Sequence, residues 1–408
     1  MEYTSSNSNQ DQIDQQSKQD AIMEDVNRKE LIAVKLKQEG KDSAHNSEEE
    51  DDVREQREKK QDEENKELIS YNQLGGQECP VDENADEVEF SMIYRIPKIE
   101  NLEKCHNLTK LGLRKNLIKK IEGLDNNILL THLELYDNRI KVIENISHLT
   151  NLVMLDISFN RITRISGIET LVNVKKLFLA SNRISKIEGL DSLINLTSLD
   201  LGDNKIRKLE NLDQLTELTE FFCAKNRLTE ISGLENLKNL NILALQANFI
   251  EKISGLDGLE QLEEIYLQQN QISRIEGLEN LPQLNTLDIA YNKLERIEGL
   301  DSNLNLQELW LNYNQIHDHD SLEYVKKFQK LQTIYLADNP IAQVTEFMEN
   351  LQTALPQLQQ IDGYVLRPGF IYKVKADSNV KPITKREIDP QAKKILQEVI
   401  VKQQSDQQ

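Results

Sequence analysis

The apolar residues of this chain recur in a unit of 22 residues. One complete unit has apolar side chains at Val174, Leu177, Leu179, Ile184, Ile187 and Leu190, with a single asparagine, Asn182, among them. An asparagine returns at the same spacing in ten consecutive units: Asn116, Asn138, Asn160, Asn182, Asn204, Asn226, Asn248, Asn270, Asn292 and Asn314. A fixed period of this length predicts a solenoid, in which each coil packs only against its neighbours.

The residues just before each asparagine alternate between apolar and polar, which predicts a short strand with its leucines pointing inward. The strands of successive units are expected to stack into one parallel sheet. The asparagine follows at the turn, where its amide is expected to bond backbone groups of its own coil and of the neighbouring coil. About thirteen residues remain for the return across the back, which is too few for a full α-helix and favours extended or 3₁₀ turns.

This unit resembles the leucine-rich repeat. The predicted fold is therefore an α/β solenoid, a right-handed leucine-rich repeat superhelix. We expect a parallel sheet on its concave face and short 3₁₀ or extended turns on its convex face. Asn145 and Asn211 stand where most units have glycine, and asparagine tolerates the same left-handed backbone.

Composition divides the chain into three parts. Residues 1–87 are predicted to be an acidic disordered tail, because they are rich in polar and charged residues and poor in apolar ones. Residues 88–370 form the repeat domain, with a half-repeat at the start in which Tyr94 replaces the asparagine, and a capping segment at the end. Residues 371–408 are expected to be a polar tail with one short helix.

The net charge of −20 is concentrated at the amino-terminal end. The first 90 residues contain 26 acidic and 11 basic residues, or −15, which leaves −5 for the other 318. Nucleic acid is not expected as a partner, because the sequence offers no evident basic face. No membrane partner is expected either, since no leader sequence and no long apolar run is present. With three cysteines and no paired spacing, we expect a soluble protein in a reducing, intracellular compartment.

Catalytic signatures are absent from the sequence, so we expect no enzyme, no cofactor and no metal site. The string His317-Asp318-His319-Asp320 is the only metal-like cluster, and a solvated, irregular turn is the preferred interpretation. Gly75-Gly76 is interpreted as a linker rather than a phosphate-binding loop.

The outward-facing strand positions carry aromatic and acidic side chains that could contact a partner. Nine of the 21 aromatic residues fall on them: Tyr136, Phe159, Phe178, Phe222, Tyr266, Tyr291, Trp310, Tyr313 and Tyr335. One column mixes rings with carboxylates, and the column beside it is mostly small. Scattered surface aromatics are the simpler explanation, but rings among carboxylates are typical of an interface with a basic protein partner.

The chain resembles the leucine-rich-repeat regulatory subunits of protein phosphatase 1 over about residues 88–370. The resemblance rests on Leu133–Asn138, Leu155–Asn160, Leu287–Ala290, on Tyr335-Leu336 before Asn339-Pro340-Ile341, and on Leu355-Pro356 to Asp362. In that family a concave column of acidic and aromatic residues binds the phosphatase. The matching positions here are Asp156, Phe178, Asp200, Phe222, Asp288, Glu308, Trp310 and Tyr335. Asp200 departs from the family, which has a longer carboxylate there, and the strand Phe221–Ala224 is divergent.

The resemblance implies a noncatalytic subunit of the nucleus and cytoplasm. It would bind the protein phosphatase 1 catalytic subunit, and a further phosphatase inhibitor protein could join the complex. The alternative is a ciliary or cytoskeletal scaffold built from the same repeat, and an enzyme is the third and least favoured reading.

Overall fold

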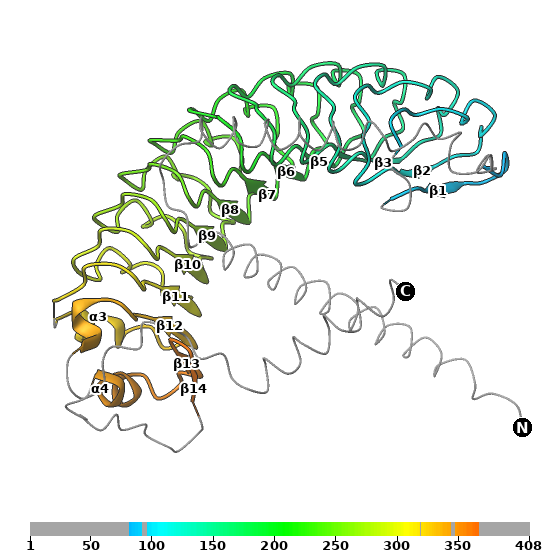
Figure 1. Cartoon of the computed structure of the whole chain (residues 1–408). Helices are drawn as coiled ribbons and strands as arrows, with labels where there is room; N and C mark the ends of the chain where they lie inside the picture. Colours follow the sequence, from blue (N-terminus) through cyan, green and yellow to red (C-terminus); the bar gives the residue numbers. More distant parts are fainter. Residues whose placement is uncertain (1–80, 92–95, 319, 344–346, 367–408) are drawn as a thin grey trace, which may run out of the picture. The chain divides into compact units, whose positions relative to one another are not determined.

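The computed structural model describes residues 81–91, 96–318, 320–343 and 347–366. These residues all belong to one compact unit, Pro80–Gln408. They form a curved array of coils whose strands line the inner side of the curve (Figure 1). The predicted solenoid with a parallel sheet on its concave face is confirmed.

A single sheet of fourteen strands runs through the described residues in sequence order. All neighbouring strands are parallel except the last pair, β13 and β14. The strands are β1 Glu87–Glu89, β2 Lys110–Gly112, β3 His132–Glu134, β4 Met154–Asp156, β5 Lys176–Phe178, β6 Ser198–Asp200, β7 Glu220–Phe222, β8 Ile242–Ala244, β9 Glu264–Tyr266, β10 Thr286–Asp288, β11 Glu308–Trp310, β12 Thr333–Tyr335, β13 Gln360–Ile361 and β14 Tyr364–Val365.

The core is one continuous column of leucine and isoleucine. The middle residue of each strand points inward and pairs with its equivalent one coil away, as Leu155 does with Leu177. Both side chains are fully buried, as are Leu179, Ile184 and Leu190 of the same coil. Each coil therefore buries its apolar side only between its two neighbours, which is the packing expected of a repeat array.

The asparagines form the predicted ladder. Asn160 donates through Nδ2 to the carbonyls of Ile157, in its own coil (3.1 Å), and of Leu135, one coil back (2.9 Å). Its Oδ1 accepts from the backbone N–H of Ile140 at 2.9 Å. The other nine asparagines of the series are buried in the same way. The ladder thus satisfies backbone groups that turn away from the sheet.

Left-handed backbone occurs at two equivalent positions in most coils. Gly189 has a φ of 71°, and a Cβ there would lie 2.8 Å from the carbonyl oxygen of Ile165. Asn145 and Asn211 adopt φ values of 59° and 57° at the equivalent position, as predicted. The second position, just before each ladder asparagine, was not predicted, because its residues include bulky side chains such as Phe159 at 55°.

Between β2 and β11 the backs of the coils contain turns rather than helices. Backbone N–H groups there bond three residues back, as Leu149 does to Ile146 at 2.9 Å. A second row of asparagines, not anticipated from the sequence, crosses the flank opposite the ladder. Asn151 and Asn195 donate to Ile128 and Val172 of the preceding coil, both at 2.9 Å.

The carboxy-terminal end breaks the rhythm. Three extra residues before Asn339 accommodate helix α3, Asp320–Val325, and the 3₁₀ helix η3, Pro340–Gln343, and helix α4, Phe347–Ala354, follow. Ser321 and Tyr324 of α3 accept hydrogen bonds from the N–H groups of Ile297 and Leu300.

The metal-like string lies at the start of α3, where Asp318 Oδ1 accepts from the N–H of Asp320 at 3.2 Å. No cluster of metal ligands occurs among the described residues.

At the other end, β1 pairs with β2 and buries Val88. Tyr94 and most of both predicted tails lie outside the described residues, and the division into three parts stays a prediction. No helix in the described ranges is long and apolar enough to cross a membrane.

Candidate concave binding surface

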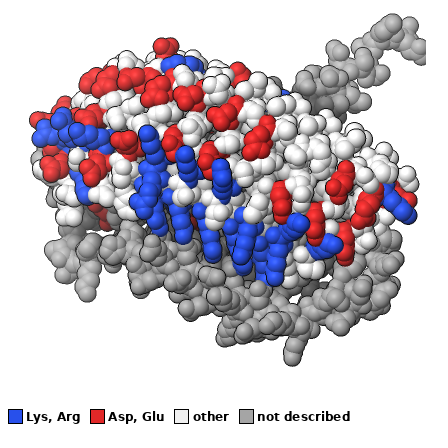
Figure 2. All heavy atoms as spheres, turned by 90° about the horizontal axis from the view of Figure 1, so that it is seen from above, with Lys and Arg blue, Asp and Glu red and all other residues white. Residues whose placement is uncertain are grey.

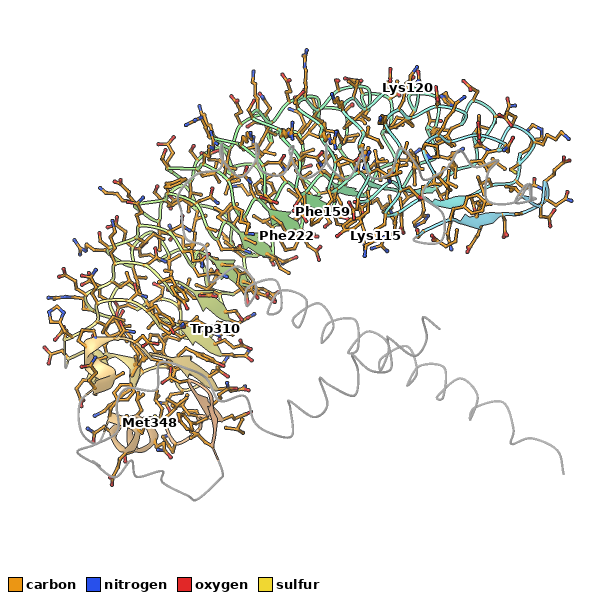
Figure 3. All side chains as sticks on the ribbon, in the orientation of Figure 1. Lys115, Lys120, Phe159, Phe222, Trp310 and Met348 are labelled. Carbon is orange, nitrogen blue, oxygen red and sulfur yellow. The ribbon has the colours of Figure 1, made fainter. Side chains whose placement is uncertain are left out.

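The third residue of each strand forms the column that the sequence singled out. The parallel register sets Asp156 beside Phe178, Phe178 beside Asp200, and so on to Trp310 beside Tyr335. Seven of the eight predicted residues stand in this column, together with Ala244 and Tyr266. The eighth, Glu308, occupies the first position of β11. Figure 3 places Phe222 and Trp310 along the inner side of the curve. We call these residues, with Glu264, the concave column.

Most side chains of the concave column are half-buried rather than open to water. The rings pack on one another. Trp310 and Tyr335 have centroids 4.8 Å apart, and Tyr291 and Tyr313, at the edge of the face, stack at 4.1 Å. The expectation of an openly exposed ring is corrected for Trp310, which is half-buried against Tyr335, whereas Tyr291 and Tyr313 are 41% and 45% exposed.

Three aspartates of the column share a local role. Asp156, Asp200 and Asp288 each accept a hydrogen bond from the N–H two residues later, at 2.9, 2.8 and 3.0 Å. A short carboxylate reaches this N–H as in an Asx turn. This contact explains why Asp200 fits its coil where the resembled family has a longer side chain.

Asp288 differs from the other two because it is buried, with 2% of its surface exposed. Burial raises the pKa of this carboxyl to about 7, while the hydrogen bond from Ala290 acts in the opposite direction. The sequence suggested an accessible carboxylate here. Lysine at this position would bury an ammonium group, so a charge reversal would damage folding before it reported on binding.

Acidic groups gather around Tyr266. Its hydroxyl donates to Glu264 Oε2 at 2.7 Å. Burial raises the pKa of Tyr266, and the charges of Glu264, Glu308 and Asp288 raise it further. Among the described residues, no Lys or Arg forms an ion pair with any of these three carboxylates. The carboxy-terminal half of the column is therefore a negative, aromatic surface without a cation of its own.

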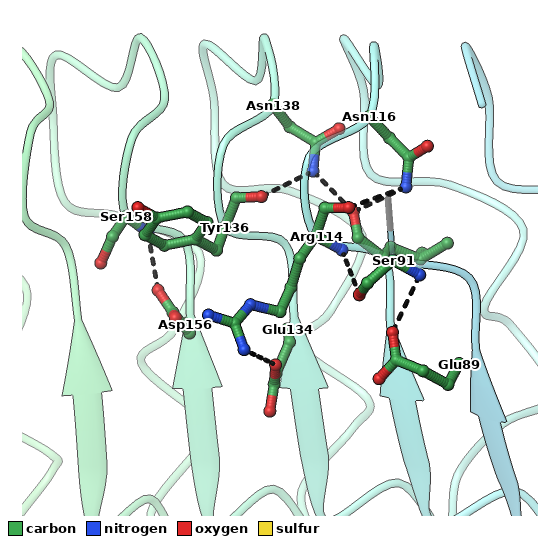
Figure 4. A network of polar contacts seen from close by, with 10 residues as sticks. Glu89, Ser91, Arg114, Asn116, Glu134, Tyr136, Asn138, Asp156 and Ser158 are labelled. Carbon is green, nitrogen blue, oxygen red and sulfur yellow. Dashed lines mark hydrogen bonds and ion pairs between the residues drawn. The ribbon is translucent and has the colours of Figure 1, made fainter. Parts of the chain in front are cut away.

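The amino-terminal end of the concave face supplies its own cation (Figure 4). Arg114 Nη1 lies 3.5 Å from Glu134 Oε2, and its guanidinium lies 5.2 Å from the centre of the Tyr136 ring. Burial raises the pKa of Glu134, and Arg114 opposes that shift. One arginine thus contacts a carboxylate and a ring two residues apart on the same strand face.

A row of amides next to the concave column was missed by the sequence reasoning. Gln246, Gln268 and Asn312 occupy the position otherwise taken by small residues such as Ala290. Gln268 is 4% exposed, and neither its Oε1 nor its Nε2 has a hydrogen-bond partner in the described structure; Trp310 Nε1 also has none. The only signal in the sequence is the appearance of amides at this position after Ala224, interrupted by Ala290.

Comparison with known proteins agrees with this architecture. A family model described as leucine-rich repeats (two copies) matches residues 128–170, 172–214, 216–258 and 260–302. None of the curated protein sequences matches the chain.

Three solved structures illustrate the likeness. An internalin from Listeria monocytogenes is 25% identical, with a TM-score of 0.59, covering 70% of this chain and 88% of that one. A leucine-rich repeat protein from Leptospira interrogans is 24% identical, with a TM-score of 0.53, covering 64% and 73%. The ectodomain of the receptor kinase GASSHO1/SCHENGEN3 from Arabidopsis thaliana, in complex with CASPARIAN STRIP INTEGRITY FACTOR 2, is 25% identical, with a TM-score of 0.50, covering 64% and 33%. Together with the ladder and the register of the sheet, these matches make the chain a leucine-rich repeat protein.

Proposed function

We propose that this protein is a noncatalytic regulatory subunit that binds the catalytic subunit of protein phosphatase 1 through the concave column. It would act in the nucleus and cytoplasm on the maturation, targeting or activity of that enzyme. A phosphatase inhibitor protein could join the complex. The leucine-rich repeats themselves indicate a scaffold for protein–protein interaction, and the phosphatase is the partner that the residues of the column favour.

One observation carries the proposal. The column is continuous from Asp156 to Tyr335, and its carboxy-terminal half combines Glu264, Asp288 and Glu308 with rings but has no internal cation. The half-buried carboxylates of Glu264 and Glu308, which lie beside half-buried rings, gain most from a partner that brings its own positive charge. A protein surface carrying lysine or arginine is therefore the occupant that the column fits.

Arg114 shows within the same molecule how such a cation would be held. It contacts Glu134 and the Tyr136 ring, which lie two residues apart on one strand face. Glu308 and Trp310 repeat this spacing on β11. A partner's lysine or arginine set between them would make the same two contacts, one with a carboxylate and one with a ring.

A ciliary or cytoskeletal scaffold is the alternative. The same repeats would serve it, but a scaffold that binds elsewhere gives no reason for three carboxylates and five rings to share one column of nine consecutive strands. Binding data on the column separate the two proposals.

The test is isothermal titration calorimetry of the full chain with the phosphatase catalytic subunit. Trp310→Ala is expected to weaken binding by about 2 to 4 kcal/mol, roughly thirtyfold to a thousandfold, because a large ring would be fully desolvated in the complex. Glu308→Lys is expected to weaken it as well, since it would face a basic partner surface with like charge.

Lys252→Ala, an exposed change on the back of the array, is the control and is expected to leave the dissociation constant unchanged. Circular dichroism checks that each variant is folded. If the wild-type chain does not bind the catalytic subunit, the phosphatase proposal fails. If folded Trp310→Ala/Glu308→Lys binds as tightly as wild type, the concave column is not the binding surface.

A further inference from the structure

A second surface of this protein is strongly basic. In the six coils that begin at Asn116 and end at Glu230, the first, third and fourth residues after each ladder asparagine include twelve Lys or Arg and one acidic residue. The twelve are Lys119, Lys120, Arg139, Lys141, Arg161, Arg164, Arg183, Lys186, Lys205, Arg207, Lys208 and Arg227. We call them the basic band. The same positions in the next three coils hold four basic and two acidic residues, so the charge fades beyond Arg227.

The fold aligns these cations in rows. The first residue after each asparagine donates its N–H to the preceding coil, as Arg161 does to Ile140 and Arg183 to Ile162, both at 2.8 Å. Coils related in this way lie about 4.8 Å apart. Five consecutive coils from Arg139 to Arg227 therefore carry a cation at the same point. Figure 2 shows basic side chains gathered over neighbouring coils.

The basic band is separate from the concave column. Its fourth-position residues lie on the outer side of the array, where Figure 3 places Lys120, while Lys115 lies toward the inner side. Nothing in the proposed phosphatase contact uses these residues. The proposed phosphatase contact therefore does not explain why Lys and Arg are concentrated in the basic band.

Acidic residues border the basic band along its length and make it narrow. The ninth position after the asparagine holds Asp125, Glu169, Asp191, Asp213 and Glu235 in five of the same six coils. The sixth position after the asparagine also carries acidic residues, and Glu188 there pairs with Arg164 of the band at 2.8 Å. A broad polyanion such as a nucleic acid duplex would bring its charges over this acidic row and be repelled.

The residue types favour an acidic peptide over single-stranded nucleic acid. None of the eighteen positions that define the band carries an aromatic ring, whereas proteins that bind single strands stack bases on such rings. Arginine, present six times in the band, pairs with carboxylates through two parallel hydrogen bonds. A row of cations that follows the array also matches a chain lying extended across the coils.

We propose that the basic band is a second protein-binding surface, which holds an acidic, extended segment of a partner protein. It lets one repeat domain bind two proteins at once, one on each face. This inference does not depend on the identity of the partner in the concave column.

The experiment measures fluorescence anisotropy of a labelled oligoglutamate peptide titrated with the full chain at about 0.1 M salt, where exposed charges still interact over about 10 Å. Lys120→Glu/Lys186→Glu/Lys208→Glu changes three exposed fourth-position residues of the band. Lys252→Glu/Arg274→Glu/Arg296→Glu is the matched control, since it changes the same position in later coils by the same total charge. Thermal unfolding confirms that both variants are folded.

The band variant is expected to lose about tenfold or more in affinity for the peptide, and the matched control less than about twofold. Equal losses in the two variants would show that only overall charge matters and would overturn the proposal. Tighter binding of labelled oligothymidine than of oligoglutamate would overturn it in favour of single-stranded nucleic acid. A wild-type chain that does not bind the peptide would leave the band as a solvated surface and refute the inference.

Discussion

At the scale of single residues, one side chain often has two tasks. Asp156, Asp200 and Asp288 were selected as candidate contacts for a partner, and each also closes the end of its own strand. Sequence reasoning identified their column correctly, because the period of two assigns each residue to a face. It did not foresee the burial of Asp288, which depends on the bulk of Tyr266 and Trp310 one coil away on either side.

The burial of Asp288 predicts a pH dependence of stability. Its folded pKa of about 7 lies above the ordinary value of 3.8 for an aspartate, so between these values the folded state holds a proton that the unfolded state has lost. The free energy of unfolding is therefore expected to fall as the pH rises from about 4 to about 7 and to level off above it. The full effect is on the order of 4 kcal/mol.

Asp288→Asn provides the comparison, because its amide oxygen can accept from Ala290 without titrating. Urea unfolding of both proteins across this pH range gives the difference directly. The variant should gain stability relative to wild type as the pH rises, and parallel curves would contradict a raised pKa at Asp288.

At the scale of the coil, the unit predicted from the sequence matches the structure in its strand, its ladder and its back. What the sequence did not predict has a physical cause. The residue before each ladder asparagine adopts positive φ without glycine, as at Ser181 (53°) and Tyr291 (56°). The hydrogen bonds on both sides impose this strained backbone, and tertiary context, not local propensity, decides it. The flank row, with Asn151 and Asn195, was overlooked because exposed asparagine is unremarkable in a loop.

The asparagine ladder joins neighbouring coils, and its contribution to stability can be tested by substituting a single asparagine. Asn204→Ala removes the acceptor of the Ile184 N–H (2.9 Å) and the donor to the carbonyls of Leu179 and Leu201 (both 3.0 Å). Because these groups are buried, the loss is expected to cost about 1 to 3 kcal/mol of unfolding free energy, measured in urea.

Asn195→Ala is the control for the ladder variant. It removes one bond, to Val172 at 2.9 Å, on an exposed flank where water can replace it. A cost well below that of Asn204→Ala is expected. Equal effects of the two changes would mean that the ladder has no special role.

At the scale of the whole molecule, a repeat brings residues that are far apart in the sequence together on one surface. The regular spacing made the concave column predictable from the sequence, because each position of the unit forms one line along the array. The basic band follows the same rule, yet the net charge of −20 concealed it. Its twelve cations alternate in sequence with the acidic residues of the next turn, and only stacking of the coils separates the two signs. The protein does have a basic face, so the expectation that it lacks one is wrong. The narrowness of the basic band is the remaining argument against nucleic acid as a partner.

The last coil of an array has no neighbour on one side and must be covered by a cap. The role of the carboxy-terminal cap can be tested by a substitution in α4. Leu351 of α4 is fully buried beneath the last coils, where Asp362 accepts from the N–H groups of Leu336 and Ala337, both at 2.7 Å. Leu351→Ala is expected to cost about 2 to 5 kcal/mol locally. Because each coil depends only on its neighbours, hydrogen exchange should rise first in β12 and β13 and leave β3 to β5 protected. Leu243→Ala, at a fully buried site in the middle of the array, is the comparison and should raise exchange on both sides of β8. A uniform rise across all strands in Leu351→Ala would mean that the array unfolds as one unit and that α4 does not act as a local cap.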